Sequence, residues 1–222
     1  MRVALFGGSF DPPHCGHVAL ARLARERLAL DRILVAPVGT QPLKQETPPA
    51  SFEDRVAMTH LAFAHEPKME VSLVDAPRSD GRSNYTIDTL GTLRQQLHPG
   101  DALFCILGAD SFLTIGKWHR SPDLLTSCNF IIGGRPGFDL GHAEAALPSG
   151  ITANLLPAEL PATRLFELSA GDRNSRLYLL MDLAEDISAT QIRSALRGDS
   201  AAGVLDPAVA RYIGTHYLYS HL

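Results

Sequence analysis

Short apolar runs alternate with amphipathic segments along the first two-thirds of the chain. Each run is a few residues long and is bounded by Gly, Pro or Asp, which is the pattern of strands buried in a sheet. Alternation of such strands with helical segments is typical of the β-α units that build a parallel sheet. The predicted strands are Val3–Phe6, Ile33–Ala36, Glu70–Val74, Leu103–Leu107 and Phe130–Ile132.

Helical segments fill the gaps between these strands. His17–Leu28 has apolar residues at a helical spacing with arginines between them, and Phe52–Ala64 and Thr86–Leu97 show a similar period. A stripe of this kind is most often the side of a helix that faces the core. The sequence therefore predicts an α/β fold with a Rossmann-like, doubly wound parallel sheet.

The pattern loosens in the last third of the chain. Residues 138–176 are rich in Gly, Pro and Ala, so no element is placed there and we expect a variable or flexible section. Order returns with a predicted strand at Arg176–Met181 and helices at Ser188–Arg197 and Pro207–Tyr217, the last with proline at its start. No internal repeat or linker is visible, so we expect one domain over residues 1–222 with a C-terminal helical portion.

The composition narrows the classes of function. The chain has 222 residues, of which 45% are hydrophobic and 20% charged, as in an ordinary globular protein. A net charge of −4 gives no field for holding nucleic acid, so we expect no nucleic-acid partner. The longest nearly uninterrupted apolar run, from Ala102 to Leu107, falls far short of the roughly 20 residues that cross a bilayer. We therefore expect no membrane association.

Location and thiol chemistry follow from the start of the chain and its cysteines. An apolar run begins at Val3, which leaves no room for a secretion signal, so we expect a cytoplasmic protein. Cys15, Cys105 and Cys128 are an odd, widely spaced set without a CxxC pair, which favours reduced thiols. Cys105 and Cys128 lie in apolar runs and are predicted core residues. The sequence assigns no oligomeric state.

The most informative stretch, GGSFDPPHCGH, lies between the first strand and the first helix at residues 7–17. In an open parallel sheet, ligands bind past the carboxyl ends of the strands, where the next helix presents N–H groups to an anion. Gly7 and Gly8 lack the Cβ that would block a close approach. The Asp-Pro-Pro turn presents His14 toward this crevice, and His17 begins the helix. Both imidazoles can donate hydrogen bonds to phosphoryl oxygens.

Two other interpretations of this stretch exist. Taken separately, a loop glycine pair and two histidines are more often turn chemistry and polar surface. Two histidines three residues apart, with no further cluster of ligands, are a weak zinc pattern, so we predict no protein metal site. The combination of glycine pair, Asp-Pro turn and HxGH unit at one strand-to-helix junction is much rarer and favours a phosphate site.

The stretch resembles the HxGH signature of the nucleotidyltransferase superfamily, and its full form resembles the bacterial nicotinate-nucleotide adenylyltransferase family. Ile187–Arg193 matches the superfamily's second ATP signature, ISxTxIR, and Tyr85–Leu90 resembles its YTxxTL segment. Gly108-Ala109-Asp110 with Trp118 resembles a GxD…W segment, and Arg135-Pro136-Gly137 and the ending Val209–Tyr219 also match. The likeness runs from residue 3 to residue 219 and is weakest between about 138 and 176.

The resemblance implies a site for ATP. Ser188 and Thr190 would add donors at the start of the late helix, and Arg193, one turn further on, would reach a β- or γ-phosphate. Taken alone, Ser-x-Thr before a helix is a capping motif. Asp110 resembles the residue that contacts the adenosine ribose. The implied catalytic residues are His14, His17 and Arg193, and the implied ATP-binding residues are Gly7, Gly8, Ser9, Phe10, His14, His17, Gly108, Asp110, Ile187, Ser188, Thr190 and Arg193.

The resemblance also implies a site for nicotinate mononucleotide. Trp118 would stack on the pyridine ring, although single tryptophans are usually packing residues. Where the family usually reads PxxxPPHK, this chain has Leu43 in the place of a common histidine, followed by Lys44. We expect the mononucleotide's phosphate to be held by Lys44 or Arg135. The implied residues for this substrate are Lys44, Tyr85, Thr86, Trp118 and Arg135.

The expected reaction joins nicotinate mononucleotide to ATP, with Mg²⁺ carried on the ATP phosphates, and forms nicotinate adenine dinucleotide and pyrophosphate. Two alternatives stay open at the level of the sequence. One is another HxGH transferase, with nicotinamide mononucleotide or phosphopantetheine as acceptor. The other is a non-catalytic nucleotide-binding regulator that keeps the fold.

Overall fold

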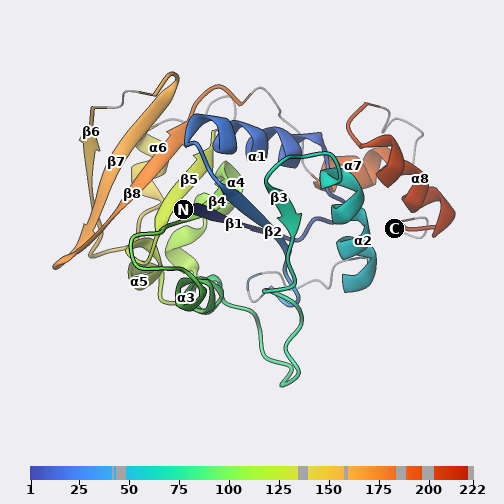
Figure 1. Cartoon of the computed structure of the whole chain (residues 1–222), viewed down its shortest axis with the longest axis horizontal. Coiled ribbons are helices and arrows are strands. Elements are labelled where there is room, and N and C mark those ends of the chain that lie inside the picture. Colours follow the sequence, from blue (N-terminus) through green and yellow to red (C-terminus); the bar gives the residue numbers. More distant parts are fainter. Residues whose placement is uncertain are drawn as a thin grey trace.

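The structure is a computed structural model that describes residues 1–41, 43, 49–134, 140–157, 160–183, 189–196 and 203–219. An eight-stranded sheet runs through these residues in the order β3-β2-β1-β4-β5-β8-β7-β6 (Figure 1). The first six strands of this order pair in parallel, and the last two pairs are antiparallel. The strands are β1 (Arg2–Gly8), β2 (Arg32–Pro37), β3 (Met69–Val71), β4 (Ala102–Gly108), β5 (Asn129–Gly133), β6 (Thr152–Leu156), β7 (Thr163–Ala170) and β8 (Arg173–Leu180).

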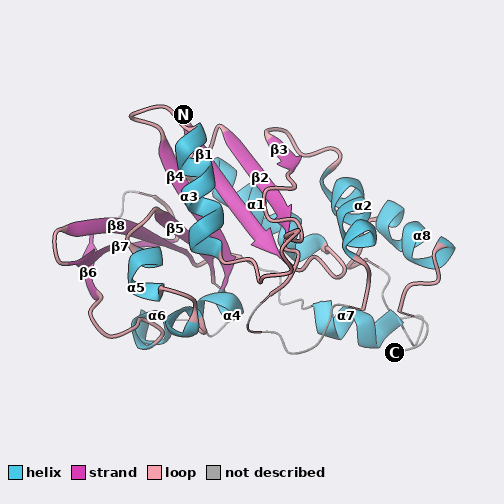
Figure 2. Cartoon of the chain, turned by 90° about the horizontal axis from the view of Figure 1, so that it is seen from below, coloured by secondary structure: helices cyan, strands magenta, loops and turns pink. Residues whose placement is uncertain are grey.

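Helices cover both faces of the sheet. Figure 2 shows α1 and α3 on opposite sides of the parallel strands. The helices are α1 (Cys15–Arg27), α2 (Phe52–Phe63), α3 (Thr86–Gln96), α4 (Ala109–Phe112), α5 (Ser121–Leu125), α6 (Leu140–Ala145), α7 (Ala189–Leu196) and α8 (Pro207–Thr215), with a 3-10 turn at Ile115–Lys117.

The alternation of side chains along β1 divides the core into two layers. Val3 and Leu5 face the layer under α3, α4 and α5, while Ala4 and Phe6 face the layer under α1. All four side chains are buried, as are Cys105 and Cys128, which confirms that these two cysteines are core residues. Because both faces are covered, strands β1, β2, β4 and β5 are apolar at nearly every position, and this apolar pattern made them predictable.

A third apolar cluster joins α2 to the end of the chain. We call it the C-terminal cluster. In Figure 1, α7 and α8 lie beside α2 at the end of the molecule away from β6. Its buried members are Ala50, Met58, Ile192, Leu205, Val209, Ile213 and Tyr219. The cluster therefore holds the last described residues against a helix that follows the second strand.

The predicted α/β architecture is confirmed, and the differences lie in its details. The third strand is shorter than predicted, and α1 begins at Cys15, two residues before His17. The section at 138–176, where no element was placed, contains α6, β6 and β7 among its described residues. Two of the pairings at this end are antiparallel, so the sheet is mostly and not wholly parallel. Strand β6 escapes prediction because its side chains are half-buried or exposed at the sheet edge.

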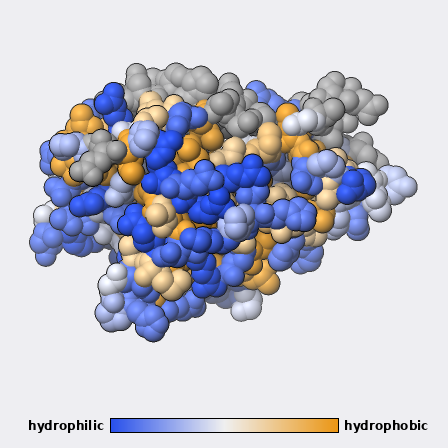
Figure 3. Space-filling model, turned by 45° about the horizontal axis from the view of Figure 1, so that its top comes forward, coloured by the Kyte–Doolittle hydropathy of each residue, from blue (hydrophilic) through white to orange (hydrophobic). Residues whose placement is uncertain are grey.

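The side of the molecule that carries α1 is mainly hydrophilic (Figure 3). The exposed residues of α1 include Arg22 and Glu26, while its buried residues are Leu20, Ala21 and Ala24. This distribution explains the spacing of apolar positions in the sequence. No helix among the described residues has the length and apolar character needed to span a bilayer.

Candidate active site

The strand order reverses between β1 and β4. From β1 the chain continues outward to β2 and β3, whereas β4, β5 and β8 lie on the other side. Ligands of open α/β sheets bind at such a switch point, beyond the carboxyl ends of the strands. Gly7, Gly8 and Gly108 lie at these ends of β1 and β4. The strand order therefore places three of the predicted ATP-binding residues at the expected crevice.

The glycines at the crevice differ in what surrounds them. A Cβ added to Gly7 or Gly108 would meet no atom of the described chain within 4 Å. A Cβ on Gly133, at the end of β5, would lie 2.6 Å from a methyl group of Leu20. A side chain at 133 would therefore require the Leu20 side chain to shift, whereas the backbone at Gly7 and Gly108 borders open space. That space allows a ligand to approach the main chain closely.

The loop after β1 is fixed by a buried arginine from α2. Arg55 is only 2% exposed, and its Nη1 donates to the carbonyl oxygens of Ser9, at 2.8 Å, and Val38, at 2.9 Å. It thereby joins the loops that follow β1 and β2. Burial lowers the pKa of the Arg55 guanidinium, and the charge of the Asp11 carboxylate opposes that shift.

The two histidines of the motif lie at the start of α1. His14 is the N-cap and His17 the third helical residue, and their ring centroids are 3.8 Å apart. The backbone N–H of His14 donates to Nδ1 of His17 at 3.2 Å, so the neutral His17 ring carries its proton on Nε2. The first turn of α1 contains no acidic residue. A helix N-terminus that carries two imidazoles and has no Asp or Glu in its first turn suits an anion.

The second motif contacts the first through an arginine. Arg193 of α7 donates from Nη1 to the carbonyl oxygen of Asp11 at 2.7 Å, and its Nη2 lies 3.3 Å from Oγ1 of Thr190. Two segments 182 positions apart in the sequence are thus joined by a direct hydrogen bond. The predicted ATP-binding residues Ile187 and Ser188 lie outside the described residues.

Asp110 occupies the first turn of the short helix α4, directly after β4. Gly108 is the N-cap of that helix, and the Asp110 side chain is exposed. The neighbouring residues Ala109 and Phe112 are buried and anchor the helix in the core. The predicted ribose contact therefore lies at the open end of β4, next to the unfilled space beside Gly108.

The residues predicted for the mononucleotide come from two neighbouring segments. Tyr85 is the N-cap of α3, and its ring stacks on His119 with centroids 4.1 Å apart. Trp118 is half-buried, packs against the core layer under α3, and donates from Nε1 to Oγ1 of Thr114 at 3.2 Å. The stacking joins the residue before Thr86 to the residue after Trp118. Lys44 and Arg135 lie outside the described residues.

Sequence reasoning missed a polar connection beside these residues. Asn84 donates from Nδ2 to the carbonyl oxygen of Ala76 at 2.9 Å and exchanges two hydrogen bonds with the backbone of Thr40. The Thr89 hydroxyl donates to the buried carboxylate of Asp75 at 2.7 Å. Burial raises the pKa of Asp75. These bonds hold the loops after β2 and β3 against the start of α3, and no local motif in the sequence indicates them.

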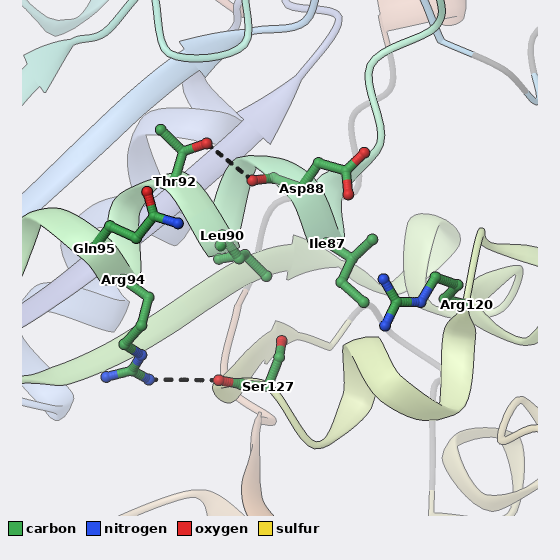
Figure 4. Close-up of a pocket in the computed structure, with 9 residues that line it drawn as sticks. Ile87, Asp88, Leu90, Thr92, Arg94, Gln95, Arg120 and Ser127 are labelled. Atoms are coloured by element: carbon green, nitrogen blue, oxygen red, sulfur yellow. Dashed lines mark hydrogen bonds between the residues drawn. The ribbon is translucent and has the colours of Figure 1, made fainter.

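A groove of about 410 Å³ lies elsewhere, on the outer side of α3 and α5 (Figure 4). Its two arginines are already bonded within the chain, since Arg94 donates to the carbonyl oxygen of Ser127 and Arg120 to Asp123. The residues that line it are Ile87, Asp88, Leu90, Gly91, Thr92, Arg94, Gln95, Arg120 and Ser127. This set includes none of the described residues that we predict for the site.

The imidazoles of the HxGH loop offer nitrogen donors, whereas Mg²⁺ requires oxygen ligands. In the part of the chain that the structure describes, no group of three or more His, Cys, Asp or Glu side chains is placed to hold a metal ion. Mg²⁺ prefers oxygen ligands and commonly binds to phosphates and water. The nitrogen donors of His14 and His17 therefore fit the phosphate groups of a nucleotide and not the ion itself.

Known proteins similar to this chain share its length and its fold. A family model described as cytidylyltransferase-like matches residues 5–195. A protein of Pelobacter propionicus named probable nicotinate-nucleotide adenylyltransferase is 38% identical over 99% of both chains. One of Laribacter hongkongensis with the same name is 39% identical over 98% of this chain and 94% of its own. The Plasmodium falciparum nicotinic acid mononucleotide adenylyltransferase complexed with NaAD superposes with a TM-score of 0.69 over 99% of this chain and 97% of its own, at 21% identity, which supports the fold.

Proposed function

The chain belongs to the cytidylyltransferase-like family and, within it, to the nicotinate-nucleotide adenylyltransferases, and we propose that it transfers the adenylyl group of ATP to nicotinate mononucleotide. The products are nicotinate adenine dinucleotide and pyrophosphate, and the step belongs to NAD biosynthesis. The observation that carries the proposal is the junction of the two motifs. Arg193 is bonded to the loop that ends in His14, beside the open space at Gly7.

The acceptor needs no catalytic base. The phosphate monoester of nicotinate mononucleotide loses its second proton near pH 6 and is already an anionic nucleophile at neutral pH. What the reaction needs is alignment of the two substrates and stabilisation of charge on the α-phosphoryl group. His17 supplies a donor at Nε2, and the N-terminus of α1 adds its positive dipole end. Arg193 supplies a fixed positive charge toward the β- and γ-phosphates.

Mg²⁺ enters with ATP as part of the substrate. Bound to the phosphate oxygens, it neutralises part of their charge. The chain's own contribution is a cradle of N–H and N⁺–H donors. A site built from histidines, helix N-termini and an arginine is consistent with a metal ion that binds through the phosphates of ATP.

The pyridine side of the site lies between α3 and the turn that carries Trp118. The Trp118 ring offers a flat apolar face for stacking on the pyridine, and backbone N–H groups at the start of α3 near Thr86 would meet its carboxylate. The bonds of Asn84 fix the approach of the loop after β2 to this helix end. Lys44 and Arg135 are the basic residues proposed for the phosphate of the mononucleotide.

The experiment that tests the function compares acceptors side by side. Pyrophosphate release from ATP and Mg²⁺ is measured with nicotinate mononucleotide, nicotinamide mononucleotide, phosphopantetheine and glycerol 3-phosphate. We expect the highest kcat/KM with nicotinate mononucleotide and a dinucleotide product of the corresponding mass. A preference for another acceptor would reassign the substrate. Turnover with none of the four, together with tight ATP binding, would favour a nucleotide-binding regulator.

Replacing Trp118 by alanine is expected to raise the KM for nicotinate mononucleotide by roughly tenfold or more, because stacking of a base on an aromatic side chain contributes about 1–3 kcal/mol. The KM for ATP should change by less than about twofold. The matched control is Tyr217→Ala, which removes an aromatic ring that is 79% exposed after α8. Steady-state kinetics with each substrate varied in turn provides both constants. Equal increases in the two KM values would make Trp118 a packing residue.

A further inference from the structure

Asp11 connects the HxGH loop to two distant segments of the chain. Its carbonyl oxygen accepts from Nη1 of Arg193 at 2.7 Å, and its carboxylate Oδ1 accepts from the hydroxyl of Tyr219 at 2.7 Å. The same Oδ1 accepts from the backbone N–H of Ala50 at 3.3 Å. Asp11 is only 3% exposed. A short buried residue three positions before His14 therefore receives hydrogen bonds from partners 182 and 208 positions away.

The bond between Tyr219 and Asp11 lies in a buried, charged environment. Tyr219 is 7% exposed, and burial together with the Asp11 carboxylate raises the pKa of its hydroxyl far above the ordinary value. The hydroxyl thus remains protonated and donates over the whole working pH range. The Asp11 charge also acts on the buried guanidinium of Arg55, which fixes the same loop at Ser9. A hydrogen bond to a buried carboxylate is stronger than a neutral one.

The C-terminal cluster connects Tyr219 mechanically to Arg193. Tyr219 and Ile192 are both buried members of this cluster, and Arg193 follows Ile192 directly in α7. The backbone N–H of Cys15, in the first turn of α1, also donates to the carbonyl oxygen of Val204 at 3.0 Å. Any shift of the cluster relative to Asp11 therefore changes the position of the Arg193 guanidinium relative to the HxGH loop.

We propose that Tyr219 and Asp11 are positioning residues: their hydrogen bond sets the C-terminal cluster, and with it Arg193, at the distance from the HxGH loop at which one triphosphate contacts both. This inference rests on the proposed function of the two motifs as an ATP site. It extends the site beyond them, because the Tyr219 hydroxyl and the Asp11 carboxylate are buried and bonded to each other. The last described turn of the chain then helps to set the distance between the two groups of residues that bind the triphosphate.

The test compares two tyrosines whose hydroxyl groups donate to different carboxylates. Tyr219→Phe removes only the hydroxyl that reaches Asp11. Tyr212→Phe removes a hydroxyl that donates to Oδ1 of Asp54 at 2.9 Å and joins α8 to α2, without contact to the HxGH loop. Affinity for a non-hydrolysable ATP analogue is measured by calorimetry, together with kcat, both KM values and the melting temperature. Each variant is expected to lose a few degrees in melting temperature, since each loses one hydrogen bond to a carboxylate.

We expect Tyr219→Phe to bind the ATP analogue about tenfold more weakly than the wild type and to lose a similar factor in kcat, with an unchanged KM for nicotinate mononucleotide. Tyr212→Phe should stay within about twofold of the wild type in affinity and kcat. In an Arg193→Ala background, Tyr219→Phe should have almost no further effect, because it acts through that arginine.

Three results would overturn the positioning role. These are equal effects of the two phenylalanine variants on ATP affinity, no effect of either, or fully multiplicative losses when Tyr219→Phe is combined with Arg193→Ala. The proposed function fails in a different way. If the wild type binds the analogue but releases no pyrophosphate, adenylyl transfer is wrong, while the affinities still decide whether Tyr219 positions the clamp. A wild type that does not bind the analogue would overturn both.

Discussion

Replacing His17 by alanine is expected to lower kcat by about two to three orders of magnitude, the usual effect of removing one fixed donor from a charge-stabilising site. The physical reason is the hydrogen bond from the His14 backbone to Nδ1 of His17, which commits the proton of the neutral ring to Nε2. Contacts with His14 and with Phe10, whose centroid lies 5.0 Å from that of His17, hold the ring in place. The donor is thus oriented before ATP arrives.

A second substitution separates this catalytic role from the stability of α1. His17 is the third residue of the helix and accepts from the N-cap backbone, so its loss also removes a capping-box hydrogen bond that contributes roughly 0.5–1.5 kcal/mol. Glutamate is a favoured capping-box residue at this position, so His17→Glu should keep the melting temperature near that of the wild type. Its kcat should be at least as low as that of the alanine variant, because a carboxylate repels phosphate.

The control for general effects is His60→Ala, which removes an exposed histidine from the last turn of α2. Pyrophosphate release, circular dichroism and thermal melting are measured for all three variants. Near-normal turnover by His17→Ala, with the fold intact, would remove His17 from the reaction. A kcat of His17→Glu close to that of the wild type would show that capping is the only contribution of this side chain.

The sequence was sufficient for the central part of the fold because burial on both faces makes each parallel strand a continuous apolar run. Strands β1, β2, β4 and β5 are examples, and each was predicted to within a few residues. The edge strand β6 has no such apolar run, because its side chains are exposed or half-buried. Its partner β7 was missed in the same Ala- and Gly-rich section, where periodicity alone is too short to separate strand from loop.

For the site too, contacts between residues close in the sequence were predictable, and contacts between distant residues were not. His14 and His17 form one motif within four residues, so their proximity was predictable from spacing. Arg55 stands in an amphipathic helix and reads as part of its polar face, yet it is buried and bonded to Ser9 and Val38. Its position depends on how α2 docks on the loops, which no local pattern contains. The bond between Asp11 and Tyr219 spans 208 positions and is equally invisible to spacing.

Replacing Arg193 by alanine is expected to lower kcat/KM for ATP by about 100-fold, since a hydrogen bond from a charged group contributes roughly 1.5–3 kcal/mol and each 1.36 kcal/mol is a factor of about ten. The guanidinium has two tasks. Its Nη1 is bonded to the carbonyl oxygen of Asp11 and its Nη2 to the hydroxyl of Thr190, while its positive charge would act on the phosphate oxygens. Loss of the side chain would remove both the proposed phosphate contact and the hydrogen bond to the HxGH loop.

The lysine variant separates these tasks. Arg193→Lys keeps the charge but has a single nitrogen, which cannot hold the Asp11 carbonyl and a phosphate in the geometry of a planar fork. We expect an intermediate loss in kcat/KM for ATP of about tenfold, with a KM for nicotinate mononucleotide near that of the wild type. The matched control is Arg211→Ala, which removes an exposed arginine from α8. If Arg193→Ala stays within about threefold of that control, the hydrogen bond to Asp11 supports the loop alone and the positive charge on the triphosphate must come from another residue.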